Sequence, residues 1–85
     1  MSHSKQRILL VDDDPGIMVA VKQALTTHGY EMVTATDGLE ALDAFERESP
    51  ELVLLDLVMP RCGGLEVCQR IREYSAIPII ILSIK

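Results

Sequence analysis

The chain has 85 residues, enough for one small domain, and its formal net charge of −5 with scattered Lys and Arg argues against a basic surface that binds nucleic acid. Its composition, 48% hydrophobic and 25% charged, is typical of globular rather than disordered proteins. No secretory signal or membrane-length apolar run is evident, and Cys62 and Cys68 are too few for a disulfide framework, so we expect a cytoplasmic protein with free thiols.

The first half of the chain predicts a strand, a helix and a second strand. The apolar run at residues 8–11 is typical of a strand that is buried on both faces, and we predict the strand at about residues 7–11. Asp14 and Pro15 form a favourable helix start, and Gly29 suits the left-handed position at the helix end. A second strand at residues 31–35 follows. The apolar residues expected on one face of this helix are Ile17, Ala20, Val21, Ala24 and Leu25.

The second half repeats the alternation. Asp37 and Glu40 fit a capping box at the start of a helix that ends at residues 49–50. A strand at residues 52–55, a turn-rich loop, a helix at about residues 65–74 and a strand at residues 78–82 come next. The residues expected to face inward are Leu39, Leu42 and Phe45 in the first helix and Leu65, Cys68 and Ile71 in the second.

This order of elements predicts an α/β fold, in which right-handed crossovers make the sheet parallel. The last strand contains no charge within residues 79–82 that would discourage pairing with another strand, and we expect it to lie at an edge of the sheet. A natural domain rarely ends on such a strand. We therefore interpret the chain as a piece of a longer protein.

Acidic residues follow two of the predicted strands. Asp12, Asp13 and Asp14 come directly after the first strand, and Asp56 comes directly after the third. Ligands of open α/β sheets bind at the carboxyl ends of the strands, so these carboxylates should meet in one crevice. Asp14 is explained as a helix cap, but no structural role at a strand end explains Asp12, Asp13 or Asp56. Crowded carboxylates favour a hard divalent cation such as Mg²⁺, with one carboxylate left for chemistry.

Three motifs in this order resemble the receiver domain of bacterial two-component response regulators. They are Val11-Asp12-Asp13-Asp14, Leu55-Asp56-Leu57-Val58-Met59-Pro60 with Gly64, and Pro78 through Ser83. The resemblance implies a flavodoxin-like (CheY-like) three-layer fold with sheet order 2-1-3-4, in which the last helix, strand and helix of the family are missing. Residues 1–85 would then be the N-terminal part of a single receiver domain, without an effector domain.

The resemblance also implies roles for individual residues. Asp56 would accept a phosphoryl group, Ser83 would contact a phosphoryl oxygen and shift when phosphate arrives, and Gly64 would allow a close backbone approach. Receivers also use a Lys on a fifth strand, and Lys85 follows the fourth strand too closely to take that role. The Mg²⁺ ligands would be Asp12, Asp13, Asp56 and the backbone carbonyl of Val58.

The implied function is phosphorelay signalling. A sensor histidine kinase would supply the phosphoryl group, and a covalently linked DNA-binding output domain would receive the signal. This part of the chain itself would contact neither nucleic acid nor membrane. It would catalyse only its own phosphorylation and slow dephosphorylation, and so would not be an enzyme in the usual sense. Two alternatives stay open: a haloacid-dehalogenase-like phosphatase, and a non-phosphorylated interaction module that forms a dimer or strand-swapped oligomer through its edge strand.

Overall fold

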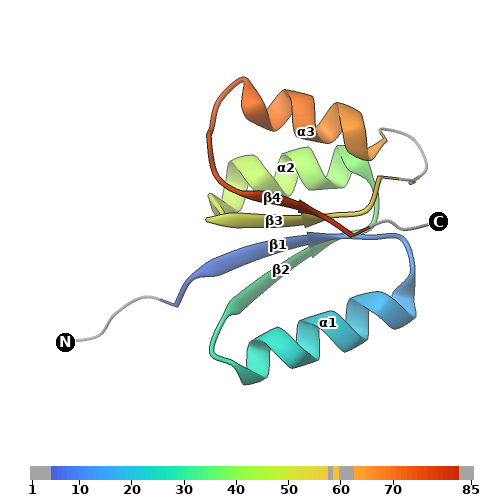
Figure 1. The fold of residues 1–85 in the computed structure, drawn as a ribbon, viewed down its shortest axis with the longest axis vertical. Coiled ribbons are helices and arrows are strands. Elements are labelled where there is room, and N and C mark those ends of the chain that lie inside the picture. The colour runs from blue at the N-terminus through green and yellow to red at the C-terminus, as the bar shows by residue number, and fades with distance from the viewer. Residues whose placement is uncertain (1–4, 58, 60–62, 83–85) are drawn as a thin grey trace.

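The computed structural model describes residues 5–57, 59 and 63–82. Strands and helices alternate along these residues, as the sequence predicts (Figure 1). None of the described helices is long and apolar enough to cross a membrane. The elements are β1 (Arg7–Val11), α1 (Pro15–Thr27), β2 (Glu31–Ala35), α2 (Gly38–Glu48), β3 (Leu52–Leu55), α3 (Gly64–Arg72) and β4 (Ile79–Ile81).

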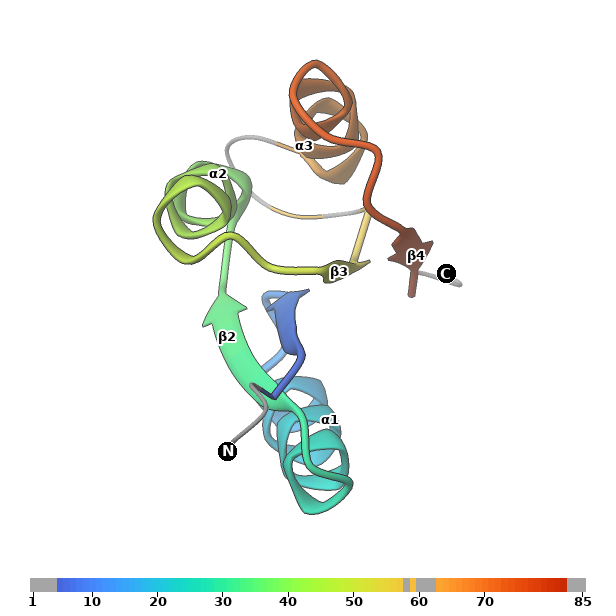
Figure 2. The same ribbon diagram turned by 90° about the vertical axis from the view of Figure 1, so that its left-hand side faces the viewer.

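The strands form one parallel sheet in the order β2-β1-β3-β4, which confirms the order that the resemblance implies. In the central strand, Leu9 lies opposite Val33 of β2 and Val53 of β3. The helix α1 covers one face of the sheet, and α2 and α3 cover the other (Figure 2). The result is the predicted three-layer α/β fold, in which the carboxyl ends of all described strands lie at the same end of the sheet.

The core consists of two apolar layers, one on each face of the sheet. Because successive side chains of β1 and β3 point to opposite faces and both faces are covered, these strands are apolar throughout, except for Arg7 at the start of β1. Burying one such side chain fully contributes about 1.5–3 kcal/mol to stability. The layer under α2 and α3 includes Leu9, Val11, Val53, Leu55, Val67 and Ile71, and the layer under α1 includes Ile8, Leu10 and Leu54.

Aspartate side chains cap the amino ends of the first two helices, as predicted. The Asp14 carboxylate accepts hydrogen bonds from the backbone N–H groups of Gly16, at 2.8 Å, and Ile17, at 3.3 Å. The Asp37 carboxylate accepts one from the N–H of Glu40 at 2.9 Å. The Glu40 side chain in turn accepts from the N–H of Thr36 at 2.6 Å, one residue before the cap position that a capping box would use.

Two residues that were expected to face the core instead point to solvent. Leu39 of α2 is 55% exposed and Leu65 of α3 is 64% exposed, so these two predictions are wrong. The buried positions lie two residues later, at Ala41 in α2 and Val67 in α3, because these smaller side chains let each helix approach the sheet closely. The other inward residues, Leu42, Phe45, Cys68 and Ile71, pack in the core as predicted.

The apolar face of α1 also differs from the prediction. Val21 and Leu25 pack against the sheet as expected, but Ile17, Ala20 and Ala24 are exposed. Their place is taken by Met18, and no residue of α1 is fully buried. Within the described residues α1 contacts mainly β2 and β1, so only part of its apolar face meets the sheet. The strand β4 is likewise shorter than predicted, at Ile79–Ile81.

Candidate functional site

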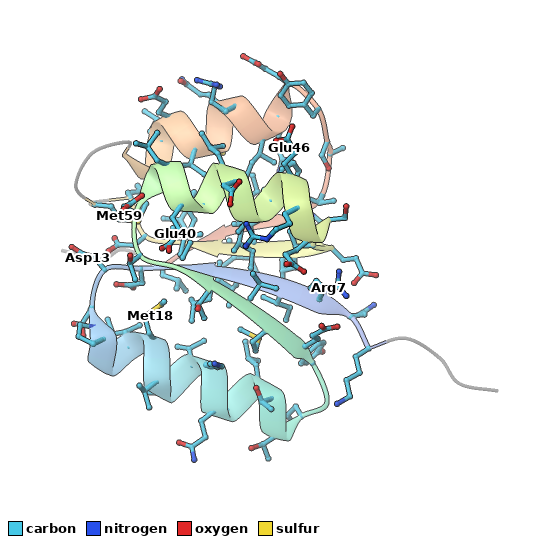
Figure 3. All side chains as sticks on the ribbon, turned by 180° about the vertical axis from the view of Figure 1, so that it is seen from behind. Arg7, Asp13, Met18, Glu40, Glu46 and Met59 are labelled. Carbon is cyan, nitrogen blue, oxygen red and sulfur yellow. The ribbon has the colours of Figure 1, made fainter. Side chains whose placement is uncertain are left out.

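Three carboxylates meet at the carboxyl end of the sheet. Asp12 follows β1, Asp56 follows β3, and Asp13 lies in the turn toward α1. One oxygen from each of the three side chains lies within 4.8 Å of the others. Asp12 and Asp56 are each only 3% exposed, whereas Asp13 is open to solvent. Figure 3 shows Asp13 at this end of the sheet, with Arg7 at the opposite end.

The backbone of the two buried acids continues the strand hydrogen bonds. The N–H of Asp12 donates to the carbonyl of Ala35 at 3.1 Å, and the N–H of Asp56 donates to that of Val11 at 2.9 Å. A second hydrogen bond fixes the orientation of the Asp12 carboxylate, because its Oδ1 accepts a hydrogen bond from the backbone N–H of Asp14 at 2.8 Å. Both acids are thus held by rigid sheet backbone rather than by a loop. Asp14 itself caps α1, as its position in the sequence predicts.

The local electrostatics favour a bound cation. Burial raises the pKa of Asp12, and repulsion from Asp56, Asp13 and Asp14 raises it further, against the opposing effect of the Asp14 N–H bond. Within the described residues, no Lys or Arg forms an ion pair with Asp12 or Asp13. Carboxylate oxygens at this spacing suit a small hard ion such as Mg²⁺, which would lower the repulsion.

Two of the predicted site residues lie outside the described residues. They are Val58, whose carbonyl was expected to bind Mg²⁺, and Ser83, which was expected to contact the phosphoryl group. Lys85 and Cys62 lie outside them too. The structure therefore brings together Asp12, Asp13 and Asp56, and the ligand roles of these residues and of Val58 all stay predictions.

Gly64 determines how closely α3 approaches the loop that follows Asp56. Its N–H donates to the carbonyl of Leu57 at 3.1 Å. A Cβ at this position would lie 2.5 Å from the Cα of Leu57 and would also collide with the Asp56 carbonyl oxygen. The predicted close approach is therefore confirmed, and only glycine fits. Met59 entered the sequence analysis only as part of a motif, with no predicted packing role; the structure shows that it packs against the core.

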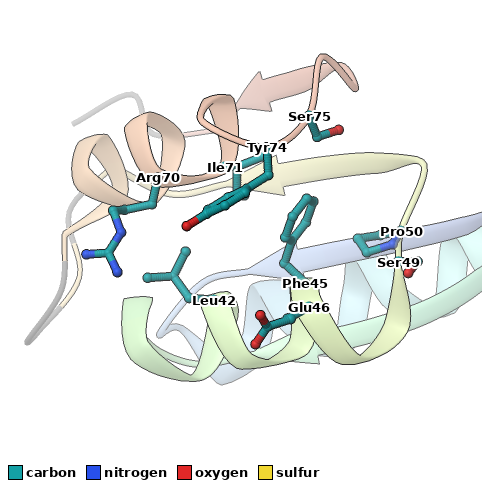
Figure 4. A pocket seen from close by; sticks show the side chains of 9 residues that line it. All are labelled: Leu42, Phe45, Glu46, Ser49, Pro50, Arg70, Ile71, Tyr74 and Ser75. Carbon is teal, nitrogen blue, oxygen red and sulfur yellow. The ribbon is translucent and has the colours of Figure 1, made fainter.

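A separate hollow of about 520 Å³ lies between α2 and α3. Its floor includes Phe45, Pro50 and Ile71, while Glu46 and Tyr74 stand at its rim (Figure 4). None of the three clustered aspartates lines it. This hollow is therefore distinct from the acidic site.

Comparison with known proteins agrees with the fold and the acidic cluster. The family model of the response regulator receiver domain matches residues 8–85. The probable transcriptional regulator ycf27 of Porphyra purpurea is 46% identical over 83 residues, which are 98% of this chain but 34% of that protein. This chain therefore spans about a third of the length of such relatives.

Solved structures give the same result. The N-terminal domain of a response regulator receiver protein from Methanoculleus marisnigri matches with a TM-score of 0.88 and 39% identity, over 96% of this chain and 69% of that one. A structure of the histidine kinase ThkA in complex with the response regulator protein TrrA matches with a TM-score of 0.85 and 44% identity, over 92% of this chain and 68% of that one. The chain belongs to the response regulator receiver domain family.

Proposed function

We propose that this chain accepts a phosphoryl group on Asp56, in a reaction that depends on Mg²⁺, and acts as the receiver part of a response regulator. The observation that carries the proposal is the position of the Asp56 carboxylate, buried at the end of a central strand and grouped with Asp12 and Asp13. A carboxylate is a competent nucleophile toward phosphorus, as in aspartyl-phosphate ATPases.

The transfer forms a bond between an Asp56 carboxylate oxygen and phosphorus while the bond between phosphorus and the donor breaks. With a phosphohistidine donor, the imidazole nitrogen leaves with the electron pair and takes up a proton. The backbone hydrogen bond from Asp56 to Val11 fixes the start of the Asp56 side chain, and phosphoryl transfer depends on such positioning. Later hydrolysis by water would restore the carboxylate slowly. The chain would thus act on itself and not turn over a separate substrate.

The cation has a defined place in this proposal. Asp12, Asp13 and Asp56 would hold Mg²⁺, together with the carbonyl of Val58. When bound, Mg²⁺ neutralises part of the negative charge of the carboxylates and of the phosphoryl oxygens. Ser83 would offer its hydroxyl to a phosphoryl oxygen, and the added charge of about −1.5 to −2 could then shift the segment that carries it.

The relatives suggest the partners. TrrA is seen in complex with a histidine kinase, and ycf27 of Porphyra purpurea is a probable transcriptional regulator. By extension, a cytoplasmic sensor kinase domain would phosphorylate this chain. A covalently linked DNA-binding domain would carry the output, while residues 1–85 themselves, with a net charge of −5, would make no contact with nucleic acid.

The test is intact mass after incubation with Mg²⁺ and a small acyl-phosphate donor. We expect one phosphoryl adduct in the natural chain and in Asp14→Asn, and no adduct in Asp56→Asn. The Asp14→Asn control removes a neighbouring charge but keeps a good helix cap. An adduct that persists in Asp56→Asn would place the acceptor elsewhere. If the natural chain carried no adduct at all, the proposal would fail for this chain.

The family match argues against the phosphatase alternative. A haloacid-dehalogenase-like enzyme needs a second Asp two residues after its nucleophile, and Val58 occupies that position after Asp56. We therefore expect no hydrolysis of a generic phosphomonoester. Turnover that depended on Asp56 would reverse this conclusion.

A further inference from the structure

The hollow between α2 and α3 forms where both helices end on the same face of the sheet. The helix α2 ends at Glu48 and α3 at Arg72, and the segments that follow each helix complete the wall. Its volume of about 520 Å³ lies within the range of about 300–1,000 Å³ that is typical of small-molecule sites. The hollow is therefore large enough for a ligand with one ring and a short chain.

The hollow is separate from both the acidic cluster and the edge of the sheet at β4. The helix α2 covers β2 and β1, whereas β4 lies at the opposite edge of the sheet (Figure 2). No residue of β4 lines the hollow, and all of its lining lies within residues 42–75. The shape of the hollow is thus set by two helices and the segments after them, and not by the open side of β4.

The floor of the hollow is apolar and carries two aromatic rings. Pro50 and Ile71 are buried, and Phe45 of α2 and Tyr74, two residues after the end of α3, extend into the hollow (Figure 4). Tyr74 is 80% exposed, so most of its ring is accessible to a ligand. The faces of aromatic rings attract cations electrostatically. The floor therefore suits an apolar ligand body, and the rings suit a positive charge attached to it.

The charged groups of the lining favour a cation over an anion. The carboxylate of Glu46 takes part in no ion pair or hydrogen bond within the described residues. Arg70, the other charged residue of the lining, lies 3.8 Å from the carboxylate of Glu66 on the same helix. A bound anion would have to compete with Glu66 for Arg70, whereas a bound cation would find an open counter-charge at Glu46. The net charge of −5 adds a general attraction for cations.

We propose that this hollow binds a small aromatic ammonium ion, with its ring on the floor beside Phe45 and Ile71 and its ammonium group between Glu46 and the Tyr74 ring. Such a ligand combines an apolar body for the floor with a charge that matches the one carboxylate of the lining. None of the three clustered aspartates lines the hollow, so this ligand and Mg²⁺ occupy different sites.

The first test is an NMR titration of the chain with 2-phenylethylammonium, in excess Mg²⁺ that competes for any binding at the acidic cluster. We expect saturable shifts at the residues of the hollow, with a dissociation constant on the order of 1 mM, because so small a ligand binds weakly. The anion 3-phenylpropionate has the same ring and linker and should bind about three- to tenfold more weakly. Equal binding of the two probes, shifts centred on Asp12 and Asp56, or no saturable shift would overturn the proposal.

A pair of charge variants tests the role of Glu46. Glu46→Gln should weaken the binding of 2-phenylethylammonium about threefold, since an exposed ion pair is lost. Glu73→Gln is the matched control, because it removes the same charge from an exposed residue outside the lining, and it should change binding far less. Both positions are exposed, so both variants should fold, which circular dichroism verifies. Equal losses in the two variants would assign the attraction to the overall charge and would contradict a defined site.

Tyr74→Leu tests the aromatic contact. This change keeps an apolar side chain but removes the ring face, so binding of 2-phenylethylammonium should weaken about threefold and binding of 3-phenylpropionate should change less. Equal losses for the two probes, or unchanged binding of the ammonium ion, would contradict the proposed place of its charge.

Discussion

The two ends of the sheet both gather carboxylates, but they hold them in different ways (Figure 3). At the amino end, the Arg7 guanidinium lies 3.2 Å from the Glu31 carboxylate and 3.8 Å from that of Glu48, and it also donates to the Glu48 carbonyl at 2.6 Å. The backbone N–H of Arg7 donates to the Glu51 carboxylate at 2.6 Å. The negative charges at this end therefore have a counter-charge within the chain.

The carboxyl end is built differently. Asp12, Asp13 and Asp56 lie together, two of them are buried, and no ion pair to Asp12 or Asp13 is found within the described residues. One end is therefore a structural clamp, whereas at the other end the neighbouring carboxylates put Asp12 under an electrostatic stress that raises its pKa. Stress of this kind is typical of functional sites.

Asp12→Asn should have the largest effect on this contrast. We expect Mg²⁺ affinity to fall about 100-fold, at the upper end of the losses known for changes around metal ligands, because a direct ligand is lost. In the absence of Mg²⁺ the same variant should be more stable, since a buried charge and its repulsion disappear. Thermal unfolding with and without Mg²⁺ measures both. Asp14→Asn is the control: it relieves only the weakest of the three repulsions on Asp12 and should change both quantities far less. Equal responses of the two variants would contradict this expectation.

Gly64→Ala should destabilise the chain by about 1–3 kcal/mol, because the new methyl group collides with the backbone at Asp56 and Leu57. The displacement would also slow phosphorylation of Asp56. Gly63→Ala is a close control, since the nearest atom to its Cβ would lie 4.0 Å away. Denaturant unfolding gives the free energies. If the two variants lost the same stability, backbone crowding would not explain the need for glycine at position 64.

Arg7→Met should weaken the opposite end of the sheet by about 1 kcal/mol, since partly exposed ion pairs contribute little and the bond to the Glu48 carbonyl adds to them. This loss should not depend on Mg²⁺. Lys22→Met removes a positive charge from exposed α1 and serves as the control. A loss of Mg²⁺ binding in Arg7→Met would show that the two ends are not independent.

The smallest effect should appear in the pH dependence of the free energy of unfolding. The pKa of Asp12 is raised above its ordinary value of 3.8, so the folded chain binds this proton more tightly than the unfolded chain. Without Mg²⁺, stability should therefore fall as pH rises from 3.8 through the raised value. Mg²⁺ binds the charged carboxylate and should reduce that fall. Asp12→Asn should lack this component, and an unchanged pH profile in the variant would assign the effect to another group.

Much of the fold followed from local sequence signals. The bounds of β1, β2 and β3 were predicted correctly because short apolar runs between turn residues leave few alternatives. Asp14 and Asp37 were recognised as caps because a carboxylate before a helical pattern has a direct physical role. The strand order came from the family resemblance and not from these signals.

The inward faces of the helices were harder to predict. Leu39 and Leu65 are larger and more apolar than Ala41 and Val67, yet the smaller residues are buried. The distance between helix and sheet decides which of these residues is buried, and that distance depends on tertiary packing, which local periodicity does not contain.

For the candidate site, the predicted strand ends placed Asp12 and Asp56 correctly. The reason for Gly64 required the actual position of the backbone after Asp56.

The most direct test of the contrast between the two ends is a titration with Mg²⁺ that follows the backbone amide signals by NMR. We predict saturable shifts at the carboxyl end, centred on Asp12, Asp13 and Asp56, with Arg7 and Glu31 at the amino end unchanged. Shifts centred on the amino end, or no saturable shift anywhere, would contradict the claim that the acidic cluster is a cation site.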